Sequence, residues 1–396
     1  MQDKTRTIVF LVLATAAGMS LWFMTAAILP DITAEAGLST GHQTLLSSAV
    51  QAGFVAGALI ISISGAADRI DPRHVFATCA VGTAVANALL LVVPIGSDVA
   101  IGLRFLTGAL MAGVYPVGMK IAVGWGLKDR GLLVGILVGA LTLGKSVPYG
   151  LAWLGGADWR LALTSGSIVA AVGGLLVLRA NLGPHHRHAP AFRPHAIILA
   201  WTDRRIRSAY LGYLGHMWEL FALWAWMAAA AAASYSATIG AHDAVDLGKL
   251  TAFVAISAGA PVCILAGRIA DTFGKAKVAM VSMAASGTLA LATAASFGGP
   301  AALTFVLFVL WGIAVIPDSA QFSALVADFA PPEWAGSLMT FQTALGFLLT
   351  VATVQLSPVI AETFGWPALL AGLAIGPLFG VIAMLPLARL YKSERV

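Results

Sequence analysis

The fold of this chain is decided by one short charged turn that occurs twice, first as Ser64-Gly65-Ala66-Ala67-Asp68-Arg69-Ile70-Asp71-Pro72-Arg73 and again as Gly267-Arg268-Ile269-Ala270-Asp271-Thr272-Phe273-Gly274-Lys275. Each copy lies between two apolar runs, so each is expected to join two membrane-spanning helices. Asp271 follows Asp68 by 203 residues (271 minus 68), which is close to half of the 396-residue chain. We therefore expect a duplicated bundle of helices in a membrane.

The composition excludes an ordinary soluble domain. Hydrophobic residues make up 59% of the chain, charged residues make up 10%, and the mean hydropathy is +0.89. A helix needs about 20 apolar residues to cross a hydrocarbon layer of roughly 30 Å. The apolar runs are too long and unbroken for the alternating strands of a membrane barrel. Twelve runs are candidate helices, at residues 7–30, 43–65, 74–94, 98–125, 131–154, 161–180, 207–233, 249–267, 278–297, 301–328, 336–359 and 367–388.

The basic residues predict the orientation. If both termini lie inside, 18 of the 23 Lys and Arg residues fall on the cytoplasmic side, whereas the outer loops keep Arg160 and Lys249. This asymmetry follows the positive-inside rule, so we expect both termini in the cytoplasm and the protein in a bacterial inner membrane. The net charge of +5 is then a consequence of membrane topology and requires no nucleic-acid partner.

Two six-helix bundles are expected, at residues 1–182 and 207–396, joined by a cytoplasmic linker at 183–206. The linker is rich in Pro, Gly and His, which favours a solvated, flexible connection. Pro116 and Pro317 should kink the fourth and tenth helices, because proline removes a backbone donor. Cys79 and Cys263 lie in apolar helices of different halves, so neither a disulfide nor a metal site is expected.

The second copy of the turn carries a family signature. Gly267 through Lys275 resembles the pattern G-x-x-x-D-R-x-G-R-[KR], which marks the loop between the second and third helices in the major facilitator superfamily, with Thr272 in place of Arg. The first copy has Ser64 and Asp71 in place of the two glycines of the pattern. This resemblance implies an all-α membrane protein with twelve transmembrane helices in two pseudo-symmetric six-helix bundles. It also implies that helices one, four, seven and ten line a central cavity.

Three further stretches extend the resemblance. Arg104-x-x-x-Gly108 is similar to the second motif of the superfamily, in which an arginine faces the substrate path. Ser20-Leu21-Trp22-Phe23 and Gly215-His216-Met217-Trp218-Glu219 resemble a group of bacterial carriers that includes nitrate and cyanate transporters.

Ionisable side chains inside the expected helices are the candidates for substrate contact. Such groups cost roughly 2.5–3.5 kcal/mol each on insertion scales, so they usually face a cavity or a partner. Lys145 lies mid-helix, and a buried ammonium needs a carboxylate or an anionic substrate. Nearby aromatic residues could form walls for an organic ligand, although an aromatic stripe more often serves packing. The predicted substrate-binding residues are Arg104, Lys145, Tyr115, Trp22, Trp218, Lys120 and Gln321.

Proton transfer is assigned to a second set of residues. Glu219 lies near the middle of the seventh helix, and His216 precedes it by one turn on the same helix face. A carboxylate and an imidazole within reach can pass a proton or switch an ion pair as access alternates. Asp318, beside the expected Pro317 kink, is a further candidate. The alternative is that Glu219 only neutralises a basic residue such as Lys145.

The repeated turns are predicted to act as gate latches. Their carboxylates can cap a neighbouring helix or pair with an arginine across the two bundles. The predicted gating residues are Asp68, Arg69, Arg73, Asp271 and Lys275.

The main functional hypothesis is a proton-coupled secondary active transporter for a small anion, with an organic anion favoured. Three interior cations against two carboxylates motivate it, because an anion would balance the surplus. The alternatives are a proton/drug antiporter for amphipathic or cationic compounds and, less favoured, a non-transporting membrane receptor. No Walker A, HExxH or GxSxG pattern occurs, so neither ATP-driven pumping nor an enzyme is expected. No cofactor or metal is expected, and the partners are the substrate, protons and membrane lipid around a monomer.

Overall fold

The computed structural model describes residues 2–126, 129–156, 158–186 and 192–393, and it leaves the side chains of Gln2, Ala67, Asp68, Arg130, Asp271 and residues 388–393 outside the description. These ranges contain helices and no strand. The first helices are α1 (Gln2–Gly18), α2 (Met24–Ala27), α3 (Leu29–Ala36), α4 (Thr40–Ser64), α5 (Ala66–Arg69), α6 (Pro72–Ala88), α7 (Asp98–Met111), α8 (Tyr115–Val123), α9 (Arg130–Leu154) and α10 (Trp159–Leu176). The later helices are α11 (Ile197–Thr202), α12 (Arg204–Tyr235), α13 (Ala241–Phe273), α14 (Lys275–Ala295), α15 (Ala301–Ala314), α16 (Ser319–Phe329), α17 (Pro332–Phe364), α18 (Trp366–Leu373) and α19 (Ile375–Ser393). Short 3-10 turns occupy Leu89–Leu91, Val177–Arg179 and Pro194–Ala196.

Eleven segments of the described chain are long and apolar enough to cross a membrane, and they correspond to eleven of the twelve expected spans. The remaining expected span, 7–30, is divided, because the chain leaves the helix at residues 19–23 between α1 and α2. Such a break frees backbone carbonyls inside the apolar layer. It is tolerated where other protein groups satisfy those carbonyls.

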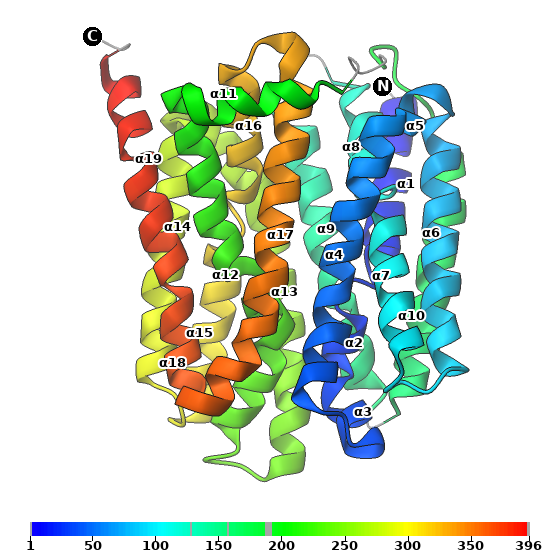
Figure 1. The fold of residues 1–396 in the computed structure, drawn as a ribbon, viewed down its shortest axis with the longest axis vertical. Helices are drawn as coiled ribbons and strands as arrows, with labels where there is room; N and C mark the ends of the chain where they lie inside the picture. The colour runs from blue at the N-terminus through cyan, green and yellow to red at the C-terminus, as the bar shows by residue number, and fades with distance from the viewer. Residues whose placement is uncertain (1, 127–128, 157, 187–191, 394–396) are drawn as a thin grey trace.

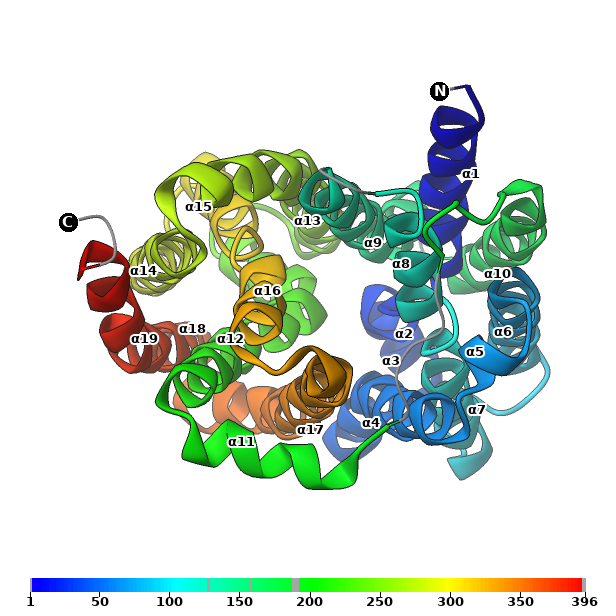
Figure 2. The same ribbon diagram turned by 90° about the horizontal axis from the view of Figure 1, so that it is seen from above.

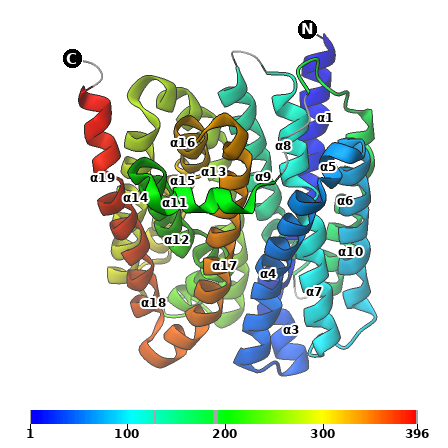
Figure 3. The ribbon, with the colours of Figure 1, turned by 45° about the horizontal axis from the view of Figure 1, so that its top comes forward.

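The helices form two groups that stand side by side, α1–α10 and α12–α19 (Figure 1). We call them the N-terminal group and the C-terminal group. They meet along α9 and α13 and along α4 and α17. Both chain termini lie at one end of the molecule, which we call the terminal end, and α11 runs across that end (Figures 1 and 3). Viewed from this end, α4, α8, α16 and α17 surround the middle of the molecule (Figure 2).

The two mid-helix prolines interrupt their spans, which confirms the predicted kinks. The fourth span is split into α7 and α8, with Pro116 in the first turn of α8. The tenth span is split into α15 and α16, and Pro317 lies in the four-residue break between them. Because proline cannot donate a backbone hydrogen bond, a helix is interrupted before it, and proline is tolerated in the first turn of the helix that follows, as at Pro116.

Glycine contacts repeat in the two groups and set their closest helix crossings. A Cβ atom added to Gly108 of α7 would lie 1.9 Å from the carbonyl oxygen of Val50 in α4. A Cβ atom on Gly312 of α15 would lie 2.3 Å from the carbonyl oxygen of Ala255 in α13. Only glycine permits such close backbone approach between membrane helices. The crossing of α4 with α7 therefore corresponds to the crossing of α13 with α15, so the repeat in the sequence is also a repeat in helix packing.

The two copies of the charged turn differ for a conformational reason. In the second copy, α13 ends at Phe273 and is followed by Gly274. The φ of Gly274 is 95°, a conformation that glycine adopts without steric cost. In the first copy, Asp71 occupies the corresponding place, and the chain instead leaves α4 at Gly65, where φ is 62°. Asp71 then acts as the N-cap of α6 by accepting a hydrogen bond from the backbone of Arg73.

One expectation about the loops is wrong. The apolar run at 249–267 predicts that the eighth span begins at Lys249 and that this residue lies at the outer loop. The structure begins α13 at Ala241, and Lys249 is buried in its third turn with 1% of its surface exposed. The polar residues Asp243 and Asp246 belong to the first turns of this helix, which extends the span beyond its apolar run.

Candidate functional site

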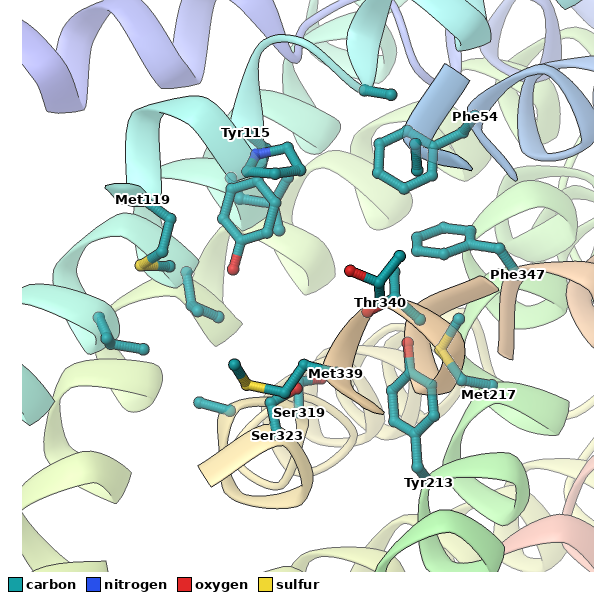
Figure 4. Close-up of a pocket in the computed structure, with 18 of the residues that line it drawn as sticks. Phe54, Tyr115, Met119, Tyr213, Met217, Ser319, Ser323, Met339, Thr340 and Phe347 are labelled. Carbon is teal, nitrogen blue, oxygen red and sulfur yellow. The ribbon is translucent and has the colours of Figure 1, made fainter. Parts of the chain in front are cut away.

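A cavity of about 550 Å³ lies between the two groups. Its walls come from the break after α1 and from α4, α8, α9, α12, α16 and α17. The expected contribution of helices one, four, seven and ten is therefore confirmed, and helices two, five and eleven contribute as well. The lining extends from Trp22 and Trp224 to Val123, the last residue of α8, and Ala327, in the last turn of α16. Both helices reach toward the terminal end (Figure 1). Tyr115 and Tyr213 face this space from opposite groups (Figure 4).

Lys145 supplies the charge at the inner limit of the cavity. Its side chain lines the cavity and is 3% exposed. The ammonium lies 4.3 Å from the ring centroid of Phe221, 4.5 Å from that of Trp22 and 5.5 Å from that of Trp224. Within the described ranges, no carboxylate pairs with it. Ring faces attract a cation by about 0.5–2 kcal/mol each, which only partly offsets the removal of the ammonium from water.

The cavity wall is otherwise apolar and carries no acidic group. Among the described lining residues none is Asp or Glu, and Lys145 is the only Lys or Arg. His216 is the one further lining residue that can become cationic. The described lining therefore combines a single lysine amine with walls of aromatic and aliphatic side chains.

Arg104 holds the break in the first span instead of lining the cavity. Its Nη1 donates to the carbonyl of Leu21 at 3.1 Å, and its Nη2 donates to the carbonyl of Trp22 at 2.8 Å. These are carbonyls that the break after Gly18 removes from helical hydrogen bonding. The guanidinium is fully buried and lies outside the lining. In this conformation Arg104 positions Trp22 and lies outside the cavity lining, so its predicted contact with a substrate stays a prediction.

Replacing Arg104 with Ala is expected to destabilise the protein. The Trp22 carbonyl would lose its donor, at about 1–3 kcal/mol for an unsatisfied group, and the Leu21 carbonyl would keep only the 3.4 Å hydrogen bond from the backbone of Met24. The guanidinium reaches both carbonyls with two nitrogens in one plane, and a lysine ammonium cannot reproduce this geometry. Arg104→Lys should therefore restore only part of the lost stability. Thermal unfolding of the purified variants in detergent measures the effect. An unchanged melting temperature in Arg104→Ala would contradict this structural role.

His216 lies between the cavity and a buried carboxylate. Its Nδ1 is 3.1 Å from Oδ2 of Asp318, and both side chains are 1% exposed. Its Nε2 is 2.8 Å from the hydroxyl of Ser319, the first residue of α16. The other carboxylate oxygen of Asp318, Oδ1, has no hydrogen-bond partner within the described chain. The Pro317 break brings Asp318 to the start of α16, opposite His216.

Glu219 faces away from this pair. Its Oε1 accepts a hydrogen bond from the indole of Trp311 at 2.6 Å, and its Oε2 accepts one from Ser286 at 2.9 Å. Glu219 is fully buried against α14 and α15 and does not line the cavity. The one-turn spacing predicted that Glu219 and His216 lie together, but α12 has helices on all sides. Glu219 contacts α14 and α15, whereas His216 contacts the start of α16.

The end of the molecule away from the termini is closed by contacts between the groups. Lys249 of α13 pairs with Asp31 of α3 at 2.8 Å and donates to the carbonyl of Gly156 at 3.2 Å. The side chains of Lys249 and Asp31 are 2% and 13% exposed. Tyr149 of α9 donates to the carbonyl of Trp224 in α12. We call the Asp31–Lys249 ion pair the latch.

Two weaker links support the closure on the same side. Gln355 of α17 donates to Ser48 of α4 at 3.1 Å, and Thr40 donates to Glu362 at 2.6 Å. A second ion pair at this end, between Glu35 and Arg160 at 2.6 Å, stays within the N-terminal group. Hydrogen bonds from Arg160 and Trp159 lower the pKa of Glu35 to about 2, so this exposed carboxylate stays ionised at neutral pH.

The predicted gating residues lie at the terminal end, and their described contacts stay within one group. Arg73 pairs with Asp71 at 2.6 Å, and this guanidinium holds the pKa of Asp71 below its usual range. Lys275 pairs with Asp328 of α16 at 2.5 Å. Arg69 is exposed at the end of α5. The side chains of Asp68 and Asp271 lie outside the described part of the structure, so their predicted gating role stays a prediction.

The structure brings four of the predicted site residues to the cavity, namely Trp22, Tyr115, Lys145 and His216. Three others are not among its lining residues, namely Lys120, Trp218 and Gln321. Trp218 donates to the carbonyl of Gly372 in α18 at 3.1 Å and packs inside the C-terminal group. Gln321 is buried beside Pro317. Trp224, Phe221 and the latch were not predicted, and only the aromatic content of the seventh helix hinted at the first two.

Comparison with known proteins now identifies the family. The model of the Major Facilitator Superfamily matches residues 11–352. The chain belongs to this superfamily. It is therefore a multi-pass membrane transporter, which agrees with the expected twelve-helix architecture. No curated protein sequence matches the chain.

A solved structure of the same superfamily shares the fold. The crystal structure of a mutant of the nucleoside transporter NupG superposes with a TM-score of 0.71, covering 96% of this chain and 100% of that one. The two sequences are 16% identical, so the likeness concerns the fold alone.

Proposed function

We propose that this superfamily member is a secondary active transporter that moves a small organic anion across a bacterial inner membrane, coupled to protons. The observation that carries the proposal is Lys145. An ammonium that faces a cavity without a carboxylate partner is costly in a low-dielectric site. An anionic substrate would supply the missing countercharge and would form charge-assisted hydrogen bonds with it.

The proposed conformation is open toward the cytoplasm. The positive-inside rule assigns the terminal end to the cytoplasm. The cavity lining reaches residues near that end, whereas the latch and Tyr149 join the groups at the other end. Alternating access would then require the latch to open while the terminal end closes.

A ligand panel tests the anionic substrate. Ligand binding to the folded protein raises its melting temperature by mass action. We expect carboxylates to shift the melting temperature of the purified protein and lipophilic cations to leave it unchanged. Repeating the panel at two pH values exposes a coupled proton. Stabilisation by cations alone would reject the anion proposal.

Proton coupling is proposed for His216 and Asp318. His216 borders the cavity, and Asp318 stands behind it with one oxygen free of hydrogen bonds. A substrate anion near His216 would favour the imidazolium, so binding of the anion and of a proton would support each other. Glu219 and Cys263 are the other titratable groups within electrostatic range of Asp318.

The variants His216→Gln and Asp318→Asn are expected to uncouple transport. In proteoliposomes, both should lose accumulation driven by a pH gradient while keeping exchange of labelled for unlabelled substrate, because exchange needs no net proton movement. Glu219→Gln is the matched comparison, since an amide can still accept from Trp311. Retained accumulation in the first two variants and its loss only in Glu219→Gln would move the proton site to Glu219.

A proton/drug antiporter is the second candidate. The observation in its favour is that the rings of Trp22, Phe221 and Trp224 already hold one cation, the ammonium of Lys145. A cationic drug could take that place if Lys145 moved away. The absence of Asp and Glu from the described lining favours the anion. Binding of tetraphenylphosphonium that strengthens in Lys145→Gln would support this candidate.

A further inference from the structure

We propose that the transported anion is an organic monocarboxylate with an apolar body. Its carboxylate would meet the ammonium of Lys145, and its body would lie along the aromatic walls toward Phe54 and Phe347. This inference rests on the proposed anion transport and narrows its substrate class. It depends on the number of charges at the cavity, on the nature of its walls and on the hydroxyls that are left to bind a ligand.

The described cavity lining offers one basic side chain besides His216, that of Lys145. Arg104, the other buried cation of the N-terminal group, donates to the carbonyls of Leu21 and Trp22 and lies outside the lining. A dicarboxylate or a phosphate would bring a second negative charge into an apolar site with only His216 near it. An uncompensated charge there is costly, so the charge balance favours a monoanion.

The walls next to Lys145 are apolar and continuous. Trp22 packs against Phe54 with ring centroids 5.0 Å apart, and Phe54 packs against Phe347 at 4.6 Å. Phe221 lies 4.9 Å from Phe347 and completes the surface. A bare inorganic anion such as nitrate would leave this surface and most of the 550 Å³ unfilled. An apolar body buries against it and gains about 25 cal/mol for each Å² removed from water.

Most hydroxyls of the lining are already engaged by the protein. Ser62 and Thr340 are paired at 3.4 Å, Ser319 bonds His216, and Ser323 bonds Gln342. Four of the seven lining hydroxyls are therefore taken. Beside Lys145, the indole N–H groups of Trp22 and Trp224 have no hydrogen-bond partner within the described residues, and they can donate to the carboxylate that meets the ammonium.

Three hydroxyls of the lining are the exceptions within the described residues, those of Tyr115, Tyr213 and Thr343. The hydroxyls of Tyr115 in α8 and Tyr213 in α12 have no hydrogen-bond partner within the described residues, and both point into the cavity (Figure 4). They come from opposite groups, so a ligand that touches both would join the two halves. They provide room for one or two polar substituents on the apolar body.

The test uses purified full-length protein and quenching of tryptophan fluorescence, because Trp22 and Trp224 flank the ammonium. The probes are benzoate, 3-phenylpropionate and octanoate, with 3-phenylpropionamide as the neutral match. Succinate, nitrate, uridine and tetraphenylphosphonium complete the panel. The variants are Lys145→Gln, Lys145→Arg and, as a charge-matched control on the exposed surface, Lys277→Gln.

We expect at least one monocarboxylate to bind more tightly than succinate, nitrate and the amide. Its affinity should fall at least about tenfold in Lys145→Gln, recover in part in Lys145→Arg and stay unchanged in Lys277→Gln. The amide should bind the wild type and Lys145→Gln alike.

The outcomes separate the two proposals. Binding of succinate or nitrate that depends on Lys145 and exceeds that of every monocarboxylate would overturn this inference and leave anion transport standing. Absence of binding by all three monocarboxylates would also overturn it. Carboxylate and amide affinities that are equal and unaffected by Lys145→Gln, or binding of tetraphenylphosphonium or uridine alone, would overturn both.

Discussion

Replacing Lys145 with Gln is expected to abolish transport while leaving the protein at least as stable as the wild type. Removal of one member of a buried charge pair between substrate and protein costs about 2–5 kcal/mol, which corresponds to a loss of about 30-fold or more in affinity. The substrate-free protein, by contrast, is relieved of a buried ammonium that has only ring faces around it. Loss of function with gain of stability marks a residue kept for binding.

Two measurements on the same preparation check this result. Uptake into proteoliposomes reports transport, and thermal unfolding in detergent reports stability. Lys277→Gln is the control for removal of a surface charge. A lower melting temperature in Lys145→Gln, together with normal uptake, would assign Lys145 to the structure and not to the substrate. Arg104→Ala is expected to show the reverse pattern for stability, because its partners are backbone carbonyls.

Breaking the latch is expected to shift the protein toward a state that is open at the end away from the termini. In Asp31→Asn the ammonium of Lys249 would stay buried with only the carbonyl of Gly156 and the more distant Asp246 beside it. Removing one partner of a buried ion pair costs about 3–5 kcal/mol, and each 1.4 kcal/mol changes a population ratio tenfold. The ratio of the open to the closed population at this end is therefore expected to rise by about a hundredfold or more.

Distances between spin labels at Ser39 and Thr363, which are exposed at the latched end, measure this shift. The native Cys79 and Cys263 are replaced by Ala for the labelling. Asp31→Asn should lengthen the distance, and the double exchange Asp31→Lys with Lys249→Asp should shorten it again. Glu35→Gln is the matched control, because it removes an ion pair at the same end but within one group. A distance that does not change in Asp31→Asn would show that the other contacts close this end by themselves.

Most of the fold could be predicted because it depends on local properties of the chain. The lengths of the apolar runs predicted eleven spans that the structure contains, and Pro116 and Pro317 predicted the breaks in the fourth and tenth. The first span is the exception. Its break after Gly18 depends on Arg104, which lies far away in the sequence and supplies donors to the exposed carbonyls.

The candidate site was predictable only in part. Lys145 could be selected because an ammonium in the middle of an apolar helix needs a carboxylate or an anionic substrate. Tyr115 could be selected because it lies on the fourth helix, which was expected to line the cavity. The partner of His216 could not be selected, because helical spacing favoured Glu219 on its own helix. The structure pairs His216 with Asp318 from α16 instead. The latch was missed because Lys249 was assigned to a loop, which hid its burial against Asp31.

The repeated turns at Asp68 and Asp271, the apolar runs and the distribution of basic residues determined a duplicated bundle of membrane helices. These features act through the hydrophobic length of each helix and the charge of each loop, which need no knowledge of neighbours. Tertiary structure decided which charges meet the cavity. Each buried ionisable group takes its surroundings from the partners that packing brings to it, so Arg104 binds a backbone, Lys249 closes an end and Lys145 is the one Lys or Arg of the described cavity lining.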